Sequence, residues 1–422
     1  MKLSIAAKPR TVEQANFHHF FWDIAWYGIA LAATKSFLQI YAIRLNANPL
    51  QIALITSLPA ICALLSSVAF SARWRSRFTN TTQSLALPAF WQRFVFLLPA
   101  FAPFFPVELR AIWLIFAICL PALGEGVAAV GFLSMFRETI PEHTTTRLLS
   151  HRSLAMNIIL GMTTVILLGW FGMEVVPFPL NYQMMFGIAF LGALMSLWHV
   201  TRVQSKDTPK AAVHSRSKVN AWRSTGFRQV IFAVVVTHIA FMSVCAVHAP
   251  YLVKALGAHE AFMAAFGLME LLGGIIGSVL VSRLVVRIGN SNTMALSMMA
   301  TAIGSVIIAF APNLWVTLIA AVYTWGGWTI TGITLFRLFT EKTRDVQPQD
   351  MICYSGAYYQ TIAISVFIGP LLGSSFANGG VNVVLLLGVG AVLRLLAAVL
   401  TQQTVVEHLV HTPVPVPAGA GD

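Results

Sequence analysis

The sequence AIWLIFAICLPALGEGVAAVGFLSM at residues 111–135 decides the fold class. It is longer than the roughly 20 apolar residues that cross the hydrocarbon core of a bilayer as an α-helix. Its one charged side chain is Glu125. The stretch therefore predicts a transmembrane helix that carries a carboxyl group near the middle of the membrane.

Similar apolar stretches recur along the whole chain. Of its 422 residues, 57% are hydrophobic and 10% are charged, and the mean hydropathy is +0.75. This composition is outside the usual range of soluble globular proteins. We predict an all-α integral membrane protein with twelve transmembrane helices. The spans are expected at residues 17–43, 50–72, 86–105, 111–135, 153–173, 183–201, 230–253, 261–282, 293–311, 315–336, 354–376 and 382–402.

The net charge of +12 follows from the topology of the chain. Most Lys and Arg residues fall in the segments that share one side of the membrane with the N-terminus, and only Arg44, Arg110 and Lys254 fall in the opposite segments. Basic residues accumulate on the cytosolic side of membrane proteins. The distribution predicts a multi-pass protein of the cell membrane with both termini in the cytosol, and it excludes nucleic acid as a partner.

A polar stretch near the middle of the chain divides the spans into six and six. We predict an N-terminal half at residues 1–202, a cytosolic linker at 203–228 and a C-terminal half at 229–403. The proline-rich residues 404–422 are expected to form a disordered cytosolic tail. We expect the chain to be a monomer in the lipid bilayer.

Polar side chains form a stripe on the fifth span and on the eleventh, which is its equivalent in the second half. Ser153 and Asn157 lie on one face of the fifth helix, and Tyr358 and Thr361 lie on one face of the eleventh. Such a stripe either bonds a neighbouring helix or lines a wet cavity. Because the stripes occupy equivalent helices, we favour a cavity.

The six-plus-six division, the cytosolic termini and the long central loop resemble the major facilitator superfamily of secondary transporters. That family carries a glycine followed by an Asp-Arg-x-Gly-Arg type sequence after its second and eighth helices. Here the later copy survives partly between Gly277 and Gly289, with Val286 at the position of the acid. The resemblance implies two six-helix halves that rock about a central site. It also implies a cytosolic gate, formed here by Arg73, Arg75, Arg77, Arg283, Arg287 and Gly289, although topology alone also produces basic turns.

Charged groups inside hydrocarbon are costly unless they are paired or hydrated, so each is a candidate site. Lys35 and Glu125 lie at similar depth in the first and fourth spans, which both face the central cavity in the resembled family. We predict that they form a substrate-binding pair, with Gln39 on the same face as Lys35. The alternative is a permanent ion pair that only fixes the packing of the two helices.

Two further acids could carry protons. Glu270 stands among glycines in the eighth span with no cation in its own segment, which favours a proton carrier, unless it only donates a hydrogen bond to a neighbouring backbone. Asp23 lies between tryptophans near the end of the first span, where capping or hydration at the interface is the favoured interpretation. Arg93 is expected to extend to the membrane surface, and Arg394 has no assigned role.

Trp328 in the tenth span joins aromatic surface to the hydroxyls of Thr324 and Thr331 on one face. This mixture suits an organic substrate that is partly apolar, although packing alone also explains it. His238 and His248 do not share a face as metal ligands would, and the chain contains no nucleotide-binding or hydrolase motif. We predict no enzymatic activity, no metal and no cofactor.

Taken together, the residues and the resemblance predict a secondary active transporter. It moves a small organic solute by alternating access, and proton coupling is a hypothesis that rests on Glu125 and Glu270. The substrate-binding residues are predicted to be Lys35, Gln39, Glu125, Asn157, Trp328, Tyr358 and Thr361. Two alternatives stay open, which are an efflux pump for lipophilic drugs and a membrane sensor or assembly protein without transport.

Overall fold

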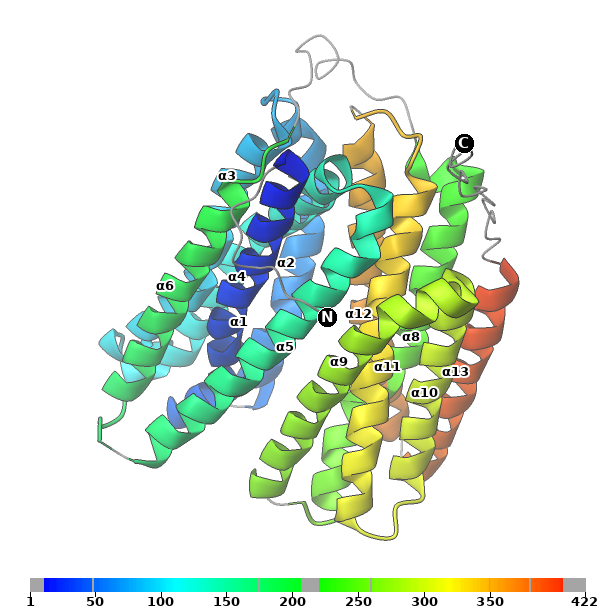
Figure 1. Ribbon diagram of the computed structural model, residues 1–422. Coiled ribbons are helices and arrows are strands. Elements are labelled where there is room, and N and C mark those ends of the chain that lie inside the picture. Colours follow the sequence, from blue (N-terminus) through cyan, green and yellow to red (C-terminus); the bar gives the residue numbers. More distant parts are fainter. Residues whose placement is uncertain are drawn as a thin grey trace, which may run out of the picture.

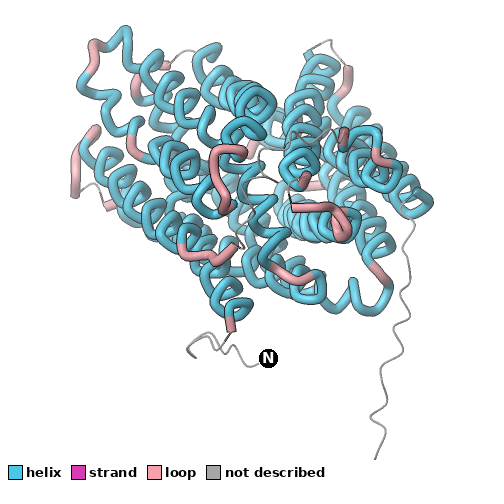
Figure 2. Tube along the Cα trace, turned by 90° about the horizontal axis from the view of Figure 1, so that it is seen from above, coloured by secondary structure: helices cyan, strands magenta, loops and turns pink. Residues whose placement is uncertain are grey.

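The chain folds into two helical bundles that lie side by side, one from each half of the sequence (Figure 1). The computed structural model describes residues 11–47, 49–173, 175–205, 220–258, 260–348, 350–378 and 381–404. Viewed from above, this part of the chain consists of helices and loops and contains no strand (Figure 2). The predicted tail and most of the predicted linker lie outside the described residues.

The first bundle contains six long helices. They are α1 (Val12–Arg44), α2 (Pro49–Arg75), α3 (Thr81–Arg93), α4 (Val107–Thr139), α5 (Glu142–Gly172) and α6 (Leu180–Thr201). Short 3₁₀ turns, η1 (Phe94–Phe96) and η2 (Leu98–Phe104), follow α3. Polar caps begin some of these helices, since the side chains of Thr11 and Asn80 accept hydrogen bonds from the first backbone N–H groups of α1 and α3.

The second bundle follows a single 3₁₀ turn, η3 (Ala221–Arg223), which falls within the predicted linker. Its helices are α8 (Thr225–Lys254), α9 (Glu260–Ile288), α10 (Asn290–Ala309), α11 (Leu314–Lys342), α12 (Met351–Asn378) and α13 (Val383–Thr404). Gly289 connects α9 to α10 with a φ of 83°, a backbone conformation that side chains with a Cβ rarely adopt.

The third span is not the single straight helix that the sequence predicts. The helical axis turns by 41° between Thr81–Phe96 and Leu98–Phe104. Pro99 and Pro103 fall in this segment, and neither has a backbone N–H for the i→i−4 pattern, so the chain takes short 3₁₀ turns instead.

Most helices have the length and apolar composition of membrane spans. Ten helices in the described residues qualify, or eleven if the bent pair after Thr81 is one span. The remaining long helix is α1, which is less apolar because residues such as His18, Asp23 and Lys35 interrupt its sequence. Together these helices form the six-plus-six arrangement.

The two halves meet along helices that correspond by the internal repeat. Helix α5 packs on α9, and α2 packs on α12, so the fifth and second helices of one half contact the second and fifth helices of the other. Smaller contacts join α4 to α12 and α5 to α11. Each half also has its own apolar core, which contains Phe37, Tyr41 and Phe186 in the first half and Phe227, Leu338 and Phe339 in the second. Apolar contacts also cross between the halves, as where Leu160 of the first half clusters with Leu271 of the second.

Candidate functional site

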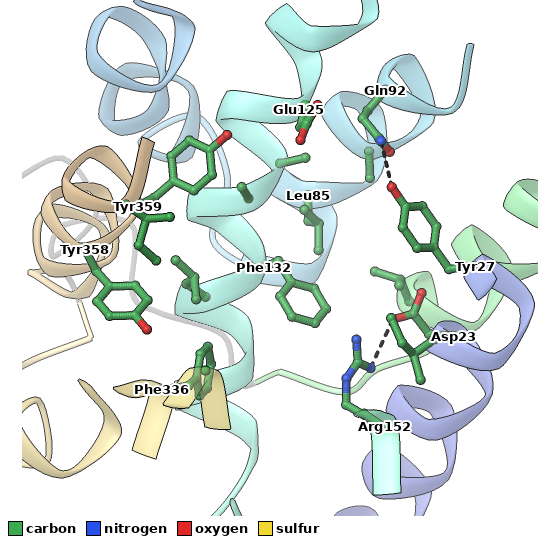
Figure 3. A pocket seen from close by; sticks show the side chains of 18 of the residues that line it. Asp23, Tyr27, Leu85, Gln92, Glu125, Phe132, Arg152, Phe336, Tyr358 and Tyr359 are labelled. Carbon is green, nitrogen blue, oxygen red and sulfur yellow. Dashed lines mark hydrogen bonds and ion pairs between the residues drawn. The ribbon is translucent and has the colours of Figure 1, made fainter. Parts of the chain in front are cut away.

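A cavity of about 460 Å³ lies between the two halves. Its wall comes from α1, α3, α4, α5 and α6 on one side and from α8, α11 and α12 on the other. Figure 3 shows Glu125 and Phe132 on α4 between Asp23 and Tyr27 of one half and Tyr358 and Tyr359 of the other. The volume is in the range of sites for small organic molecules.

Helix α4 presents Glu125 to this cavity because the residues on either side of it pack tightly against other helices. A Cβ on Gly126 would lie 1.9 Å from the carbonyl oxygen of Ala63 in α2, and a Cβ on Gly124 would lie 2.8 Å from that of Pro88 in α3. Neither position has room for a side chain. The carboxyl group of Glu125 between them is exposed and lines the cavity.

Asp23 and Arg152 form a buried ion pair between α1 and α5 at the edge of the cavity (Figure 3). Arg152 Nη1 lies 3.1 Å from Asp23 Oδ2, and Asp23 is 4% exposed. Arg152 also donates to the carbonyl of Phe20, and its guanidinium lies 5.2 Å from the ring centre of Phe132. The favoured interpretation of Asp23 as a capping or interfacial residue is therefore wrong, because its partner comes from a distant helix.

Arg93 on α3 extends this polar network inside the first half. Ser196 Oγ donates to Asp23 Oδ1 at 2.6 Å and accepts from Arg93 Nη2 at 3.1 Å. Arg93 also donates to Gln92, whose Nε2 donates to the hydroxyl of Tyr27 at 3.1 Å. The Arg93 guanidinium lies 5.1 Å from the ring centre of Tyr27. The prediction that Arg93 extends to the membrane surface is wrong, since the side chain is 8% exposed and bonds inward.

The opposite wall of the cavity is mainly aromatic. Tyr358 and Tyr359 project from α12 and Phe336 from α11 (Figure 3). His238 on α8 completes this wall, and its Nδ1 lies 2.9 Å from the carbonyl oxygen of Val234. Because a carbonyl only accepts, the proton of that bond is on Nδ1.

Two of the seven predicted substrate-binding residues, Glu125 and Tyr358, line the cavity. The side chains of two others, Lys35 and Gln39, lie outside the described residues, so the proposed pair of Lys35 with Glu125 stays a prediction. Among the described residues, Arg93 is a cation that interacts electrostatically with Glu125.

Asn157 lies at the interface of the halves and not in the cavity wall. Its Nδ2 donates to the carbonyl of Ser153 at 2.8 Å, and its side chain lies against the backbone of Gly274 in α9. The role proposed for Asn157 in substrate binding stays a prediction.

Three other predicted residues also lie outside the cavity wall. Thr361 is buried and donates to the carbonyl of Ala357 at 2.7 Å. Trp328 stacks on Phe241 with ring centres 4.0 Å apart. Glu270 is half-buried on α9. The roles proposed for these residues stay predictions.

Polar contacts between the halves gather at the helix ends nearest the linker. We call the following pairs the linker-end contacts. They are Arg137 Nε to Thr343 Oγ1 at 3.2 Å, Arg337 Nη1 to Thr146 Oγ1 at 2.8 Å, Arg344 Nε to Glu142 Oε2 at 3.7 Å and Ser134 Oγ to Ser355 Oγ at 2.9 Å. Phe136 and Phe336 pack edge to face beside them, 4.8 Å apart.

The predicted gate arginines differ from these residues. Arg75 is buried and donates to Thr81 Oγ1 at 2.9 Å, and Thr81 in turn donates to Glu138, so this arginine ties together α2, α3 and α4 of one half. Arg73, Arg77, Arg283 and Arg287 are exposed. A gate role for them stays a prediction.

Arg394, which had no assigned role, is fully buried in the second half. It donates to the carbonyl of Thr301 at 2.7 Å and to that of Phe241 at 3.0 Å. It therefore joins α13 to α10 and α8. No group of three or more His, Cys, Asp or Glu side chains that could hold a metal ion occurs in the described part of the chain.

A two-half helical bundle with a cavity between the halves defines a polytopic membrane protein of the transporter type. The family model described as Major Facilitator Superfamily matches residues 19–370, and the chain belongs to this family. The family consists of transporters and not of enzymes. No curated protein sequence matches the chain.

Solved structures support the same fold at low sequence identity. A bacterial homologue of the iron transporter ferroportin in an outward-facing state has a TM-score of 0.70 and 14% identity, over 93% of this chain and 99% of the other. The human organic anion transporter MFSD10 (TETRAN) has a TM-score of 0.71 and 11% identity, over 94% of this chain and 100% of the other. The Major Facilitator Superfamily transporter FucP in the outward conformation has a TM-score of 0.70 and 14% identity, over 94% of this chain and 100% of the other.

Proposed function

We propose that the chain moves a small organic solute across the cell membrane by alternating access, as a monomer coupled to protons. The observation that carries this proposal is the cavity between the halves, with the exposed carboxyl group of Glu125 on its wall. A site at the interface of two repeats is reached from either side when the halves rock. An ionisable group that faces such a cavity is suited to take up and release a proton.

The arrangement of the inter-half contacts supports an outward-facing conformation. The linker-end contacts join the halves at one end of the bundle, and the distribution of basic residues assigns that end to the cytosol. Two of the similar solved structures are also outward-facing states. In this proposal the linker-end contacts close the cavity toward the cytosol, and they break when the halves rock inward.

Proton coupling is tested by flux measurements on purified protein in liposomes. A thermal-shift screen of metabolites and drugs first identifies a solute, because a ligand of the folded state raises its melting temperature. Uptake or efflux of that solute is then measured with and without an imposed proton gradient. We expect the gradient to drive accumulation, and we expect Glu125→Gln to abolish that accumulation while solute exchange without a gradient persists.

Glu108→Gln is the matched control for this experiment. Glu108 is exposed in the first turn of the same helix and lies outside the cavity wall, so its removal should leave the gradient-driven flux unchanged. If the flux of the wild-type protein does not depend on the proton gradient, the protein is a facilitator. If the Glu125→Gln variant keeps its gradient-driven flux, the proton-coupling residue is another acid. Glu270 and Asp23 are the predicted candidates.

A further inference from the structure

The ionised groups of the cavity wall differ in how far they are engaged by the protein. Arg152 is paired with Asp23, and both are buried. Arg93 is buried and donates to Gln92 and Ser196. The Arg152 guanidinium is therefore neutralised by a carboxylate of its own half, whereas Arg93 bonds neutral acceptors through its two Nη atoms and its buried Nε has no hydrogen-bond partner among the described residues.

Glu125 differs from these three groups because its side chain is exposed to the cavity. Among the described wall residues it is the acid whose carboxylate a solute reaches without breaking an internal ion pair. A solute that pairs with Glu125 gains the attraction of a carboxylate inside the protein, where electrostatic interactions are stronger than in bulk solvent.

Aromatic rings from both halves line the same cavity as this carboxylate. Tyr27 and Phe132 belong to the first half, and Phe336, Tyr358 and Tyr359 belong to the second (Figure 3). The faces of aromatic rings attract cations, and groups of aromatic rings are a recognised way to bind ammonium groups. Their edges and faces also offer apolar surface to the rest of a solute.

We propose that the solute is an organic cation with an apolar or aromatic body, whose charged group binds at Glu125. This inference rests on the proposed transport function and specifies its substrate class. An anionic solute at Arg152 would have to displace Asp23, and an anionic solute at Arg93 would meet repulsion from Glu125, which interacts electrostatically with that arginine. A cation reaches Glu125 without displacing Asp23 from Arg152, and Arg93 is the charge with which it competes there.

Binding of a cation at Glu125 sets the direction in which protons and solute move. A proton and a cationic solute compete for the same carboxylate, so one leaves when the other binds. The protein then exchanges protons against the solute, and an inward proton gradient drives the cation out of the cell.

Binding of three probes of similar size and different charge tests the charge of the substrate. The probes are benzyltrimethylammonium, benzyl alcohol and benzoate, and their binding to the purified full chain in detergent is followed by the shift in melting temperature and by tryptophan fluorescence. We expect the cation to bind at concentrations about tenfold or more below those that the other two require. We expect Glu125→Gln to remove this preference and Glu125→Asp to retain part of it.

Glu108→Gln serves again as the control, and size-exclusion profiles confirm that each variant is folded. Equal binding of the cation and the alcohol, or preferred binding of benzoate, would overturn the assignment of a cation. So would a cation preference that is unchanged in folded Glu125→Gln. Gradient-driven flux of a neutral or anionic solute would overturn the substrate class and leave the transport function standing, whereas absence of any flux would overturn the transport function itself.

Discussion

The Asp23–Arg152 ion pair is buried inside the first half and needs further hydrogen bonds to be stable. Two charges removed from water cost several kcal/mol each, and their attraction offsets this cost only when further hydrogen bonds satisfy both groups. Ser196 and the carbonyl of Phe20 supply such bonds. We infer that the pair holds α1 against α5 and keeps Arg152 from binding a solute in the cavity.

Breaking this pair on one side should destabilise the protein strongly. Asp23→Asn leaves the Arg152 guanidinium buried without a counter-charge, and we expect a loss of about 3–5 kcal/mol in the free energy of unfolding. The double variant Asp23→Asn/Arg152→Gln removes both charges and should recover much of that loss. Thermal unfolding in detergent measures both variants. A double variant no more stable than the single one would show that the two residues do not act as a pair.

Sequence reasoning singled out Asp23 and Arg93 but missed Arg152, and it did not find the partners of these residues. The position of Asp23 among tryptophans resembles a membrane interface, and Arg152 resembles the basic start of a span. Their contact depends on how α1 and α5 are rotated and shifted relative to each other, which no periodicity within one helix reveals. The exposure of Glu125 was easier to predict, because an isolated acid between two glycines has few structural explanations.

At the scale of elements, the approach of α4 to α2 sets the position of Glu125. The backbone of Ala63 occupies the space where a Cβ of Gly126 would stand. A glycine at this position permits an approach that other residues would prevent. We infer that the separation of these helices controls which way the carboxyl group points.

A side chain at Gly126 should therefore disturb both stability and the cavity. We expect Gly126→Val to lower the free energy of unfolding by about 1–3 kcal/mol through overpacking, and to weaken binding of any solute that depends on Glu125. Gly187→Ala on α6 is the control, because a Cβ there meets nothing within 4 Å. The melting temperatures of the two variants decide the matter. Equal effects at both positions would show that the contact with α2 has no special role.

The elements themselves were largely predictable from the sequence. Long apolar stretches gave the helices because a bilayer requires about 20 such residues, and the expected spans correspond to the helices of the structure. The third span is the exception, since the prolines after Leu98 end the regular helix inside the apolar stretch. Hydropathy measures composition and does not detect such a break.

At the scale of the whole molecule, the linker-end contacts add polar bonds to an interface that also has apolar contacts, such as Leu160 with Leu271. Arg137 and Arg337 each cross from one half to the other to bond a threonine. Hydrogen bonds to charged groups contribute about 1.5–3 kcal/mol, whereas the exposed Arg344–Glu142 pair contributes about 0–1 kcal/mol. The half-buried Arg137 and Arg337 should therefore contribute most to closure at this end.

Removing these two arginines should shift the protein toward a state open at the linker end. We expect Arg137→Ala/Arg337→Ala to raise the amide hydrogen-exchange rates of residues 140–150 and 335–345 about tenfold or more. Arg77→Ala is the control, because Arg77 is an exposed residue of one half that contacts Trp74. If Arg77→Ala opens this end as much as the double variant does, the gate predicted from the sequence motif is the correct one.

Family membership and the two-half architecture were predictable from the sequence, but the position of the closing contacts was not. The resemblance to the family predicted a gate at the turns after the second and eighth helices, where the family's Asp-Arg-x-Gly-Arg type sequence stands. The linker-end contacts instead lie at the ends of α4, α5, α11 and α12. Such contacts depend on the relative placement of two bodies, and a sequence pattern within each body does not contain that information.

The distance between the two halves at the linker end tests the central claim most directly. Spin labels are attached at two exposed positions, His143 on α5 and Asp345 after α11, in a variant without the native cysteines. Double electron–electron resonance then gives the distribution of distances between the two labels. We expect one short distance in the resting protein and a second, longer distance whose population grows on acidification and on addition of a transported solute. A single unchanged distance under all these conditions, in protein that still transports, would contradict the account of two halves that rock about the Glu125 cavity.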